Sequence, residues 1–212
     1  MTTKRIPYGI GNYKRLQESN SYYVDKTHYI PLIEAAPFYL FFIRPRRFGK
    51  TLWLSLLENY YDINEAENFA ALFGDTYIAK NLTESCNSYL VMSFNFSMVN
   101  PNVKFVHQSF AEYGTIIVKN FLKRYPQFFN DKDYNEVLSA SSVEGQLTEL
   151  FDLVVRKKLK IYLFIDEYDN FANTILTTEG KQAYQDLTQG AGFFRYFFKA
   201  LYGFQGGGLV SI

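Results

Sequence analysis

Residues 38–51 read FYLFFIRPRRFGKT, and this stretch decides the fold that the sequence predicts. Its first six residues form a continuous apolar run, which is typical of a strand covered on both faces of a parallel sheet. The following residues, 51–61, place apolar side chains at positions i, i+4 and i+8, the spacing of one face of a helix. In such a strand–loop–helix unit, ligands bind beyond the carboxyl end of the strand. The loop between 43 and 51 is therefore the first place to look for chemistry.

This loop ends in Gly49-Lys50-Thr51, directly before the predicted helix. In a phosphate-binding loop, backbone N–H groups and the helix N-terminus attract the anion, the lysine reaches phosphate oxygens and the threonine hydroxyl ligates Mg²⁺. The full motif is G-x-x-x-x-G-K-[ST], and its first glycine is replaced by Arg44 here, so the chain must enter the loop by a different backbone path. A surface turn that merely opens a helix is the alternative, but the arginines at 44, 46 and 47 repel one another unless an anion neutralises them. We therefore predict a nucleotide-binding segment made of Arg46, Arg47, Phe48, Gly49, Lys50, Thr51 and Leu52, with Thr51 also a metal ligand.

Composition excludes several classes of function. The chain has 212 residues and a net charge of +1, so no overall field attracts nucleic acid or an anionic membrane. Cys86 is the single cysteine, which excludes an internal disulfide, and two histidines are too few for the usual zinc clusters. The longest apolar stretch, 38–43, is far shorter than the roughly 18 residues of a membrane span, and the N-terminus lacks the apolar run of a signal peptide. The sequence therefore predicts a cytoplasmic protein that does not enter a membrane.

Two further apolar runs, 89–96 and 160–165, also read as buried strands. Helical patterns lie at 65–73, 103–125 and 143–159, the last with a capping box from Ser141 and Glu144. Because strands alternate with helices and the connections are long enough for crossovers, the pattern predicts an α/β fold with a parallel sheet between layers of helices.

Asp166 and Glu167 follow the strand at 160–165, at the end where ligands bind in this class. We predict that Asp166 holds Mg²⁺ through water and that Glu167, as general base, polarises the attacking water. Lys50 completes the predicted catalytic set by neutralising phosphate oxygens. Without Gly49-Lys50-Thr51 upstream, an acidic pair after a strand would indicate only the start of a loop.

Neighbouring polar residues have other expected roles in this scheme. Asp169 and Asn170 fit a turn cap better than catalysis. At the end of the 89–96 strand, Asn95 or Ser93 is expected to contact Glu167 and gate its activity.

Three stretches of the chain together resemble a known family. They are IPYGIGNYKRLQESNSYYVDKTHYI (6–30), FFIRPRRFGKT (41–51) and YLFIDEYDN (162–170), and they resemble the predicted AAA-ATPase-like family of bacterial proteins. The resemblance implies a three-layer P-loop NTPase fold of the AAA/ASCE type, ATP and Mg²⁺ as cofactors, and a nuclease-like domain attached after the ATPase domain. It makes Lys50 and Thr51 the phosphate and Mg²⁺ contacts, and Asp166 and Glu167 the second acidic motif. In this family the R-P-R-R-F-G-K-[ST] loop is usual, so Arg44 is a family trait.

The resemblance also predicts what lies at the end of the chain. In this fold a strand bearing a sensor residue lies beside the Asp-Glu strand, and residues 206–212 look like the approach to that strand and its first residues. We therefore expect residues 1–212 to be one ATPase-like domain, a fragment that stops before the sensor residue, the lid and the nuclease-like domain.

The expected activity is Mg²⁺-dependent ATP hydrolysis that drives a conformational change in the attached domain, and a non-hydrolysing, nucleotide- or anion-binding scaffold is the alternative.

Aromatic residues make up 19% of the chain and crowd residues 192–204, where self-association is expected. Arg195 in that helix is either a residue lent to a neighbouring active site or a snorkelling interface arginine. Arg46 or Arg47 either stabilises the γ-phosphate or closes the loop, and residues 6–10 pack either on a base or in the core. Pro31 requires the helix after Tyr-Val-Asp-Lys-Thr to begin late or bend.

Overall fold

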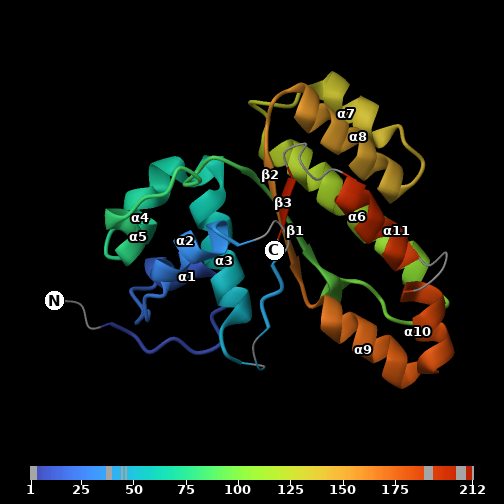
Figure 1. The fold of residues 1–212 in the computed structure, drawn as a ribbon, viewed down its shortest axis with the longest axis horizontal. Coiled ribbons are helices and arrows are strands. Elements are labelled where there is room, and N and C mark those ends of the chain that lie inside the picture. Colours follow the sequence, from blue (N-terminus) through green and yellow to red (C-terminus); the bar gives the residue numbers. More distant parts are fainter. Residues whose placement is uncertain are drawn as a thin grey trace. The chain divides into compact units, whose positions relative to one another are not determined.

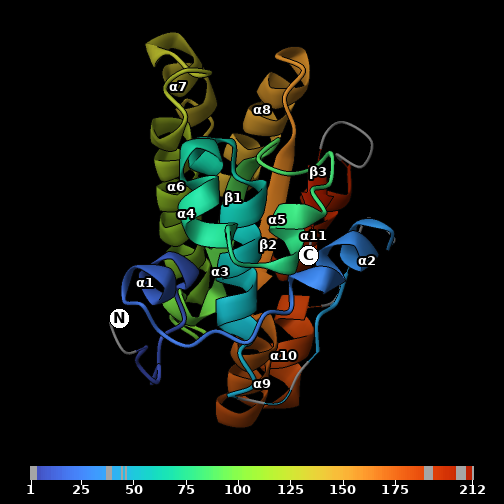
Figure 2. The same cartoon turned by 90° about the vertical axis from the view of Figure 1, so that its left-hand side faces the viewer.

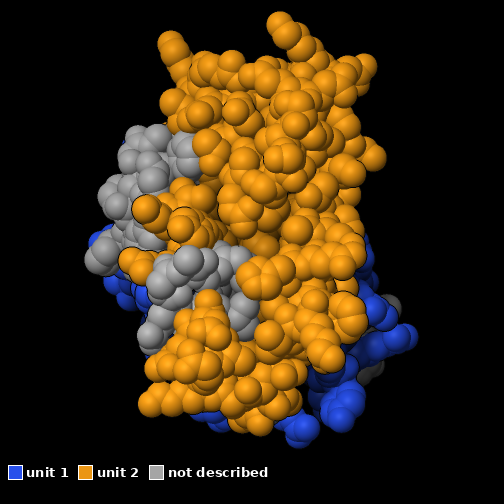
Figure 3. Space-filling view, turned by 90° about the vertical axis from the view of Figure 1, so that its right-hand side faces the viewer, with its two compact units in different colours: residues 1–91, 211–212 blue, residues 92–210 orange. Residues whose placement is uncertain are grey.

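The computed structural model describes residues 4–36, 40–43, 45, 47–188, 193–203 and 209–211, of which 169, 170, 187, 188, 193, 194, 202, 203 and 209–211 are described by backbone alone. The chain forms two compact units (Figure 1). Unit 1 comprises Met1–Val91 with Ser211–Ile212, and unit 2 comprises Met92–Val210 (Figure 3).

Unit 1 is helical. In chain order its elements are α1 (Tyr13–Glu18), the 3₁₀ helix η1 (Thr27–Tyr29), α2 (Ile30–Glu34), α3 (Lys50–Tyr61), the 3₁₀ helix η2 (Ile63–Asn68), α4 (Phe69–Phe73) and α5 (Tyr77–Lys80). The helix predicted at 51–61 is confirmed as α3, which is surrounded by the shorter helices of the unit (Figure 2). Its core-facing residues Leu56, Leu57 and Tyr60 are fully buried, because they lie on adjacent stripes of the same helix.

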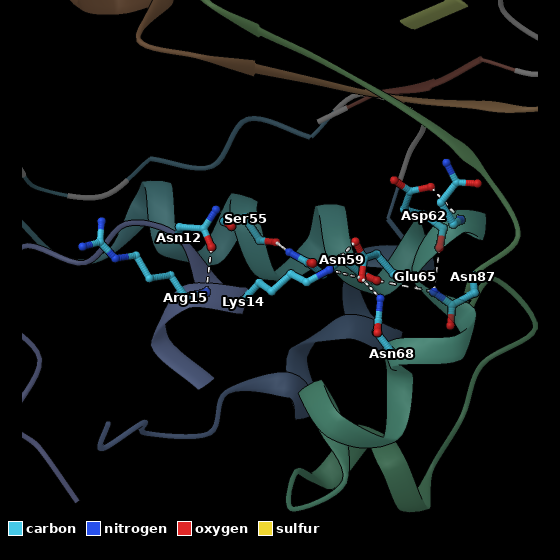
Figure 4. A network of polar contacts seen from close by, with 10 residues as sticks. Asn12, Lys14, Arg15, Ser55, Asn59, Asp62, Glu65, Asn68 and Asn87 are labelled. Atoms are coloured by element: carbon cyan, nitrogen blue, oxygen red, sulfur yellow. Dashed lines mark hydrogen bonds and ion pairs between the residues drawn. The ribbon is translucent and has the colours of Figure 1, made fainter. Parts of the chain in front are cut away.

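A network of polar contacts joins α1 to η2 (Figure 4). The Asn12 side chain caps α1 by accepting the Arg15 N–H at 2.8 Å, and Lys14 Nζ lies 3.0 and 2.9 Å from the two carboxylate oxygens of Glu65. Asn68 donates to the same carboxylate at 2.8 Å. The cap stabilises α1 itself, and the ion pair of Lys14 with Glu65 fixes α1 to η2.

Unit 2 contains most of the sheet and the longer helices. In chain order the remaining elements are β1 (Leu90–Asn95, which begins in unit 1), the 3₁₀ helix η3 (Phe96–Met98), α6 (Val106–Arg124), α7 (Asp131–Leu138), α8 (Val143–Arg156), β2 (Ile161–Asp166), α9 (Tyr168–Thr178), α10 (Gly180–Thr188), α11 (Phe193–Gly203) and β3 (Leu209–Ser211). The sheet order is β1-β2-β3, and β1 and β2 run parallel. The strands predicted at 89–96 and 160–165 are confirmed, and a third strand lies beside β2 as the end of the chain led us to expect.

Phenylalanines fill the core of unit 2. Phe197 of α11 is fully buried, and its ring centroid lies 5.1 Å from that of Phe94, 5.8 Å from that of Phe96 and 5.2 Å from that of Phe110. Edge-to-face packing of this kind adds to the free energy gained by burying the rings. Part of the aromatic surplus near the C-terminus therefore stabilises this unit.

Helix α8 packs against α6, α7 and α11. A Cβ placed on Gly114 of α6 would lie 2.3 Å from Val143 Cγ2, so glycine is what allows α6 and α8 to approach this closely. At the other end of α8, Arg156 pairs with Glu136 at 2.6 Å and Lys157 with Asp133 at 2.9 Å. These two cations are used in joining α7 to α8.

Several predicted boundaries were wrong. Residues 40–43 form no strand, and 38–39 lie outside the described residues. An apolar run forms a buried strand only if a neighbouring backbone supplies hydrogen-bond partners. The composition of the run does not specify that neighbour. Phe41 and Ile43 are 65% and 84% exposed. The three-layer P-loop sheet that depends on this strand is therefore not established.

The ends of the predicted helices also moved. The segment 65–73 divides into η2 and α4, and the long helix begins at Val106. Ser142 caps α8 by accepting the Gly145 N–H at 3.1 Å, in place of Ser141, because its backbone has the extended conformation that a cap requires. Pro31 lies in the first turn of α2, which begins late as predicted. In the described part of the chain, no helix combines the length and hydropathy needed to cross a membrane.

Candidate functional site

The turn before α3 contains two residues with a left-handed backbone. Gly49 caps the helix in the left-handed conformation (φ 78°, ψ 24°), and two residues earlier Arg47 is also left-handed (φ 68°). The Gly49 carbonyl accepts the first helical hydrogen bond, from Trp53 N–H at 2.9 Å. Lys50 and Thr51 therefore occupy the first turn, where backbone N–H groups have no partner within the helix and the helix dipole favours an anion.

The N-terminal segment supports this turn. A Cβ placed on Gly11 would lie 3.4 Å from Thr51 Cγ2, so the segment runs directly beside the start of α3. Two residues later, Tyr13 N–H donates to the Ser55 hydroxyl at 3.0 Å, and the Tyr13 hydroxyl donates to the Leu72 carbonyl at 2.8 Å. The segment beside this turn is therefore held to α3 and to Leu72 by buried hydrogen bonds.

An open cavity of about 460 Å³ adjoins the turn within unit 1. Phe48, Gly49 and Leu52 from the predicted loop line it, together with side chains from the region 22–36. The wall is mostly aromatic and aliphatic, and the volume is within the range of about 300–1,000 Å³ that is usual for small-molecule sites. Burial raises the pKa of Tyr23, which also borders the cavity, so its hydroxyl is neutral at physiological pH.

The N-terminal residues 6–10 do not pack in the core. Ile6 and Tyr8 are 87% and 98% exposed, whereas Pro7 borders the cavity. Of the two readings of this segment, core packing is therefore excluded for Ile6 and Tyr8.

The second motif lies at the end of β2 in unit 2. Asp166 is the last residue of the strand, and its carboxylate accepts the Glu167 N–H at 2.9 Å. Glu167 has a left-handed backbone (φ 59°, ψ 19°) and caps α9, whose first bond joins Phe171 N–H to the Glu167 carbonyl at 3.1 Å. The chain passes from strand to helix within one residue, and both acidic side chains are only half-buried.

The remaining predicted residues are distributed as follows. Lys50 is half-buried, Thr51 and Arg47 are exposed, and Arg46 lies outside the described residues. Because Lys50 and Thr51 belong to unit 1 and the acidic pair to unit 2, the shared catalytic and metal site stays a prediction. A hydroxyl and a carboxylate fit Mg²⁺, which takes one or two carboxylates together with phosphate oxygens. Among the described residues, no group of three or more His, Cys, Asp or Glu could hold a metal by itself.

The other sequence candidates have structural contacts or remain untested. The Asn95 side chain accepts the Ser97 N–H at 3.0 Å and so caps η3. Arg195 is exposed on α11. The side chains of Asp169 and Asn170 lie outside the described part.

Sequence reasoning missed Lys26, which borders the cavity that Phe48 and Gly49 also line. Its neighbours are both anchored: Asp25 accepts the Thr27 N–H at 2.8 Å, and the Thr27 hydroxyl accepts the Ile78 N–H at 3.0 Å. The Asp-Lys-Thr order contained a signal, because two side chains that bind backbone on either side of a lysine fix the backbone of that lysine.

Known proteins provide a family but little detail. A family model described as a predicted AAA-ATPase matches residues 7–208. An uncharacterised protein in the vnfD 5′ region of Azotobacter chroococcum mcd 1 is 43% identical over 67 residues, which is 31% of this chain and 13% of that protein. The match thus spans about an eighth of the relative's length. No solved structure gives a significant match.

Proposed function

The chain belongs to the predicted AAA-ATPase family, and from this premise we propose that it binds a nucleoside triphosphate at Gly49-Lys50-Thr51. The backbone N–H groups of the turn surround the phosphates, and Lys50 neutralises their oxygens. Arg46 and Arg47 add local positive charge, which a chain of net charge +1 does not otherwise supply.

One observation carries this proposal: Gly49 caps a twelve-residue helix in the left-handed conformation. With no side chain and this backbone, Gly49 lets a bulky anion approach the first N–H groups of α3 closely. The adjoining cavity supports it, because Phe48 and Gly49 of the turn line a space large enough for a small molecule.

We further propose that the intact protein hydrolyses ATP. Thr51 and Asp166 would hold Mg²⁺, which when bound neutralises charge on the phosphates. Glu167 would orient the attacking water and accept its proton, and Lys50 would stabilise the charge that develops on the leaving oxygens. The strand-to-helix turn at Glu167 supports this role, because it presents the carboxylate at the strand end where α/β proteins bind ligands.

The wider role follows from the family resemblance. We propose that hydrolysis in the cytoplasm drives a conformational change in an attached nuclease-like domain. Tyr196 of α11 is 52% exposed beside the buried Phe197, and this outer face is where we place self-association.

The test measures ATP affinity and phosphate release in the wild type and in the Lys50→Ala and Glu167→Gln variants. Lys80→Ala and Glu179→Gln are matched controls, because both residues are exposed and lie outside the motifs. We expect Lys50→Ala to lose binding, and Glu167→Gln to keep binding but lose hydrolysis by at least a hundredfold. Hydrolysis in Glu167→Gln at the wild-type rate would refute the assigned base. Binding without hydrolysis in the wild type would favour a nucleotide-binding scaffold.

A further inference from the structure

The segment that precedes α1 pairs with residues 20–22 along one of its edges. The Arg5 N–H donates to the Asn20 carbonyl at 3.1 Å, and the Arg5 carbonyl accepts the Tyr22 N–H at 2.8 Å, which makes a parallel β-bridge. Successive peptide groups of an extended chain point to opposite edges, so the N–H and C=O groups of Ile6 point away from this pairing. With the described residues, neither of these two groups forms a hydrogen bond. The segment therefore offers an open backbone edge to a further strand.

Large apolar side chains of both paired segments are exposed to solvent. Ile6 and Tyr8 are 87% and 98% exposed, and Pro7 between them is half-buried, which is the alternation that an extended chain gives. In the second segment Tyr22 and Val24, which also border the cavity, are 57% and 76% exposed. Because residue 5 lies beside residue 21, these four side chains share one side of the paired segments. We call Ile6, Tyr8, Tyr22 and Val24 the N-terminal face, and a cluster of this kind is typical of an interaction site.

The open edge is held in place at both ends. The β-bridge fixes it at Arg5, and beyond it the Tyr13 N–H donates to the Ser55 hydroxyl of α3 at 3.0 Å. The Asn12 side chain caps α1 between these two points. A partner would therefore bind to an edge that is already ordered, which lowers the entropic cost of binding.

Positive charge lies around the N-terminal face. Lys4 and Arg5 precede it and Lys26 follows it, and all three side chains are exposed and form no ion pair with a described residue. Residues 1–26 contain five basic and two acidic residues, a net charge of +3 in a chain whose net charge is +1. One of the two acidic residues, Asp25, accepts two backbone N–H groups. The surface therefore attracts a partner that carries carboxylates.

We propose that this surface binds an extended peptide segment of another protein, in which apolar side chains alternate with aspartate or glutamate. The peptide adds a strand at the open edge, and backbone hydrogen bonds to Ile6 supply affinity. Its apolar side chains cover Ile6 and Tyr8, and its carboxylates lie on the opposite side of the strand, where Arg5 projects. This function is separate from nucleotide binding, and it assigns Ile6 and Tyr8 to a partner instead of a base.

Calorimetric titration with a short synthetic peptide of alternating valine and aspartate tests the proposal. One comparison peptide has lysine in place of aspartate, and another has the same residues in two blocks, which removes the alternation. Ile6→Ser removes apolar surface from the face, and Lys4→Gln removes a neighbouring charge. Leu82→Ser and Lys80→Gln are matched controls, because Leu82 is 59% exposed, Lys80 is exposed, and both lie outside the face.

We expect the alternating aspartate peptide to bind at least tenfold more tightly than either comparison peptide. Ile6→Ser should weaken its binding at least fivefold, Lys4→Gln should weaken it and reduce its dependence on salt, and both controls should bind as the wild type does. Equal binding of the aspartate and lysine peptides, wild-type affinity in Ile6→Ser, or no binding at millimolar peptide would overturn the proposal. A wild-type dimer that Ile6→Ser dissociates would also overturn it, because the face would then join two copies of this chain. Displacement of the peptide by ATP would overturn it as well, because residues 6–10 would then pack on a base.

Discussion

The Gly49→Ala variant tests whether Gly49 is needed only for the conformation of the turn or also for phosphate binding. A Cβ on Gly49 would have no described heavy atom within 4 Å outside its chain neighbours, so alanine meets no steric clash. The remaining cost is conformational, because φ is 78° and an L-residue in the left-handed region loses about 1–2 kcal/mol. For a chain of this length, we expect the melting temperature to fall by roughly 2–8 °C. The fold should survive the substitution.

The effect on binding should be much larger than this. A methyl group at Gly49 would occupy the space that the phosphates need, and we expect ATP affinity to fall at least tenfold. Gly9→Ala is the matched control, because Gly9 is also left-handed (φ 65°), has equally open surroundings and lies outside the turn. Thermal unfolding and calorimetric titration of both variants provide the comparison. If Gly49→Ala and Gly9→Ala shift the melting temperature equally and both bind ATP as the wild type does, the glycine serves only the turn and the reasoning fails.

Three further predictions concern stability and reactivity. Gly114→Ala should lower the free energy of unfolding by about 1–3 kcal/mol in chemical denaturation, because its methyl would overlap Val143, and the loss should shrink in a Val143→Ala background, where that methyl has room. Burial alone would raise the pKa of Asp133, but hydrogen bonds from the Asn130 N–H and the Lys157 ammonium lower it below the usual value of an aspartate. Stability from that carboxylate is present above about pH 4 and is lost as the pH falls below it, so the stability gap between wild type and Asp133→Asn should narrow in acid, and a constant gap from pH 7 to pH 3 would contradict this. Burial raises the pKa of the Cys86 thiol to about 11, so its alkylation at pH 8, followed by mass spectrometry, should be about a hundredfold slower than that of an ordinary thiol, and a normal rate would show that the sulfur is not held as described.

Helices and strands were predictable where the hydrophobic pattern lies within a single segment of the sequence. The apolar stripes of α3 identified a helix, and the apolar runs around β1 and β2 identified strands, because these patterns report burial directly. The run at 38–43 has the same composition, yet 40–43 form no strand. Strand pairing depends on a partner far away in the chain, so composition alone does not determine it.

The same distinction between local and distant signals holds for the candidate site. The sequence could nominate Gly49-Lys50-Thr51 and Asp166-Glu167 because each motif is contiguous and each proposed role needs a particular side chain. The cavity was not, because its wall combines Tyr22, Leu32 and Leu52 from separate segments, and apolar residues in a wall look the same in sequence as apolar residues in a core. Exposure distinguishes them, and only the folded chain reveals exposure.

Backbone strain gives an independent reason to connect both motifs with function. Five non-glycine residues in the described chain have left-handed φ values: Asn20, Arg47, Asn87, Lys158 and Glu167. Asparagine tolerates this conformation, and Lys158 directly follows the end of α8, where helices commonly terminate in it. Arg47 and Glu167 have neither explanation, since one precedes a helix and the other caps one, where an extended backbone is usual. Strain that local structure does not require persists when something else selects it. Both residues lie at the turns where the proposed chemistry needs a phosphate cradle and a carboxylate, so their strained backbones agree with the proposed function.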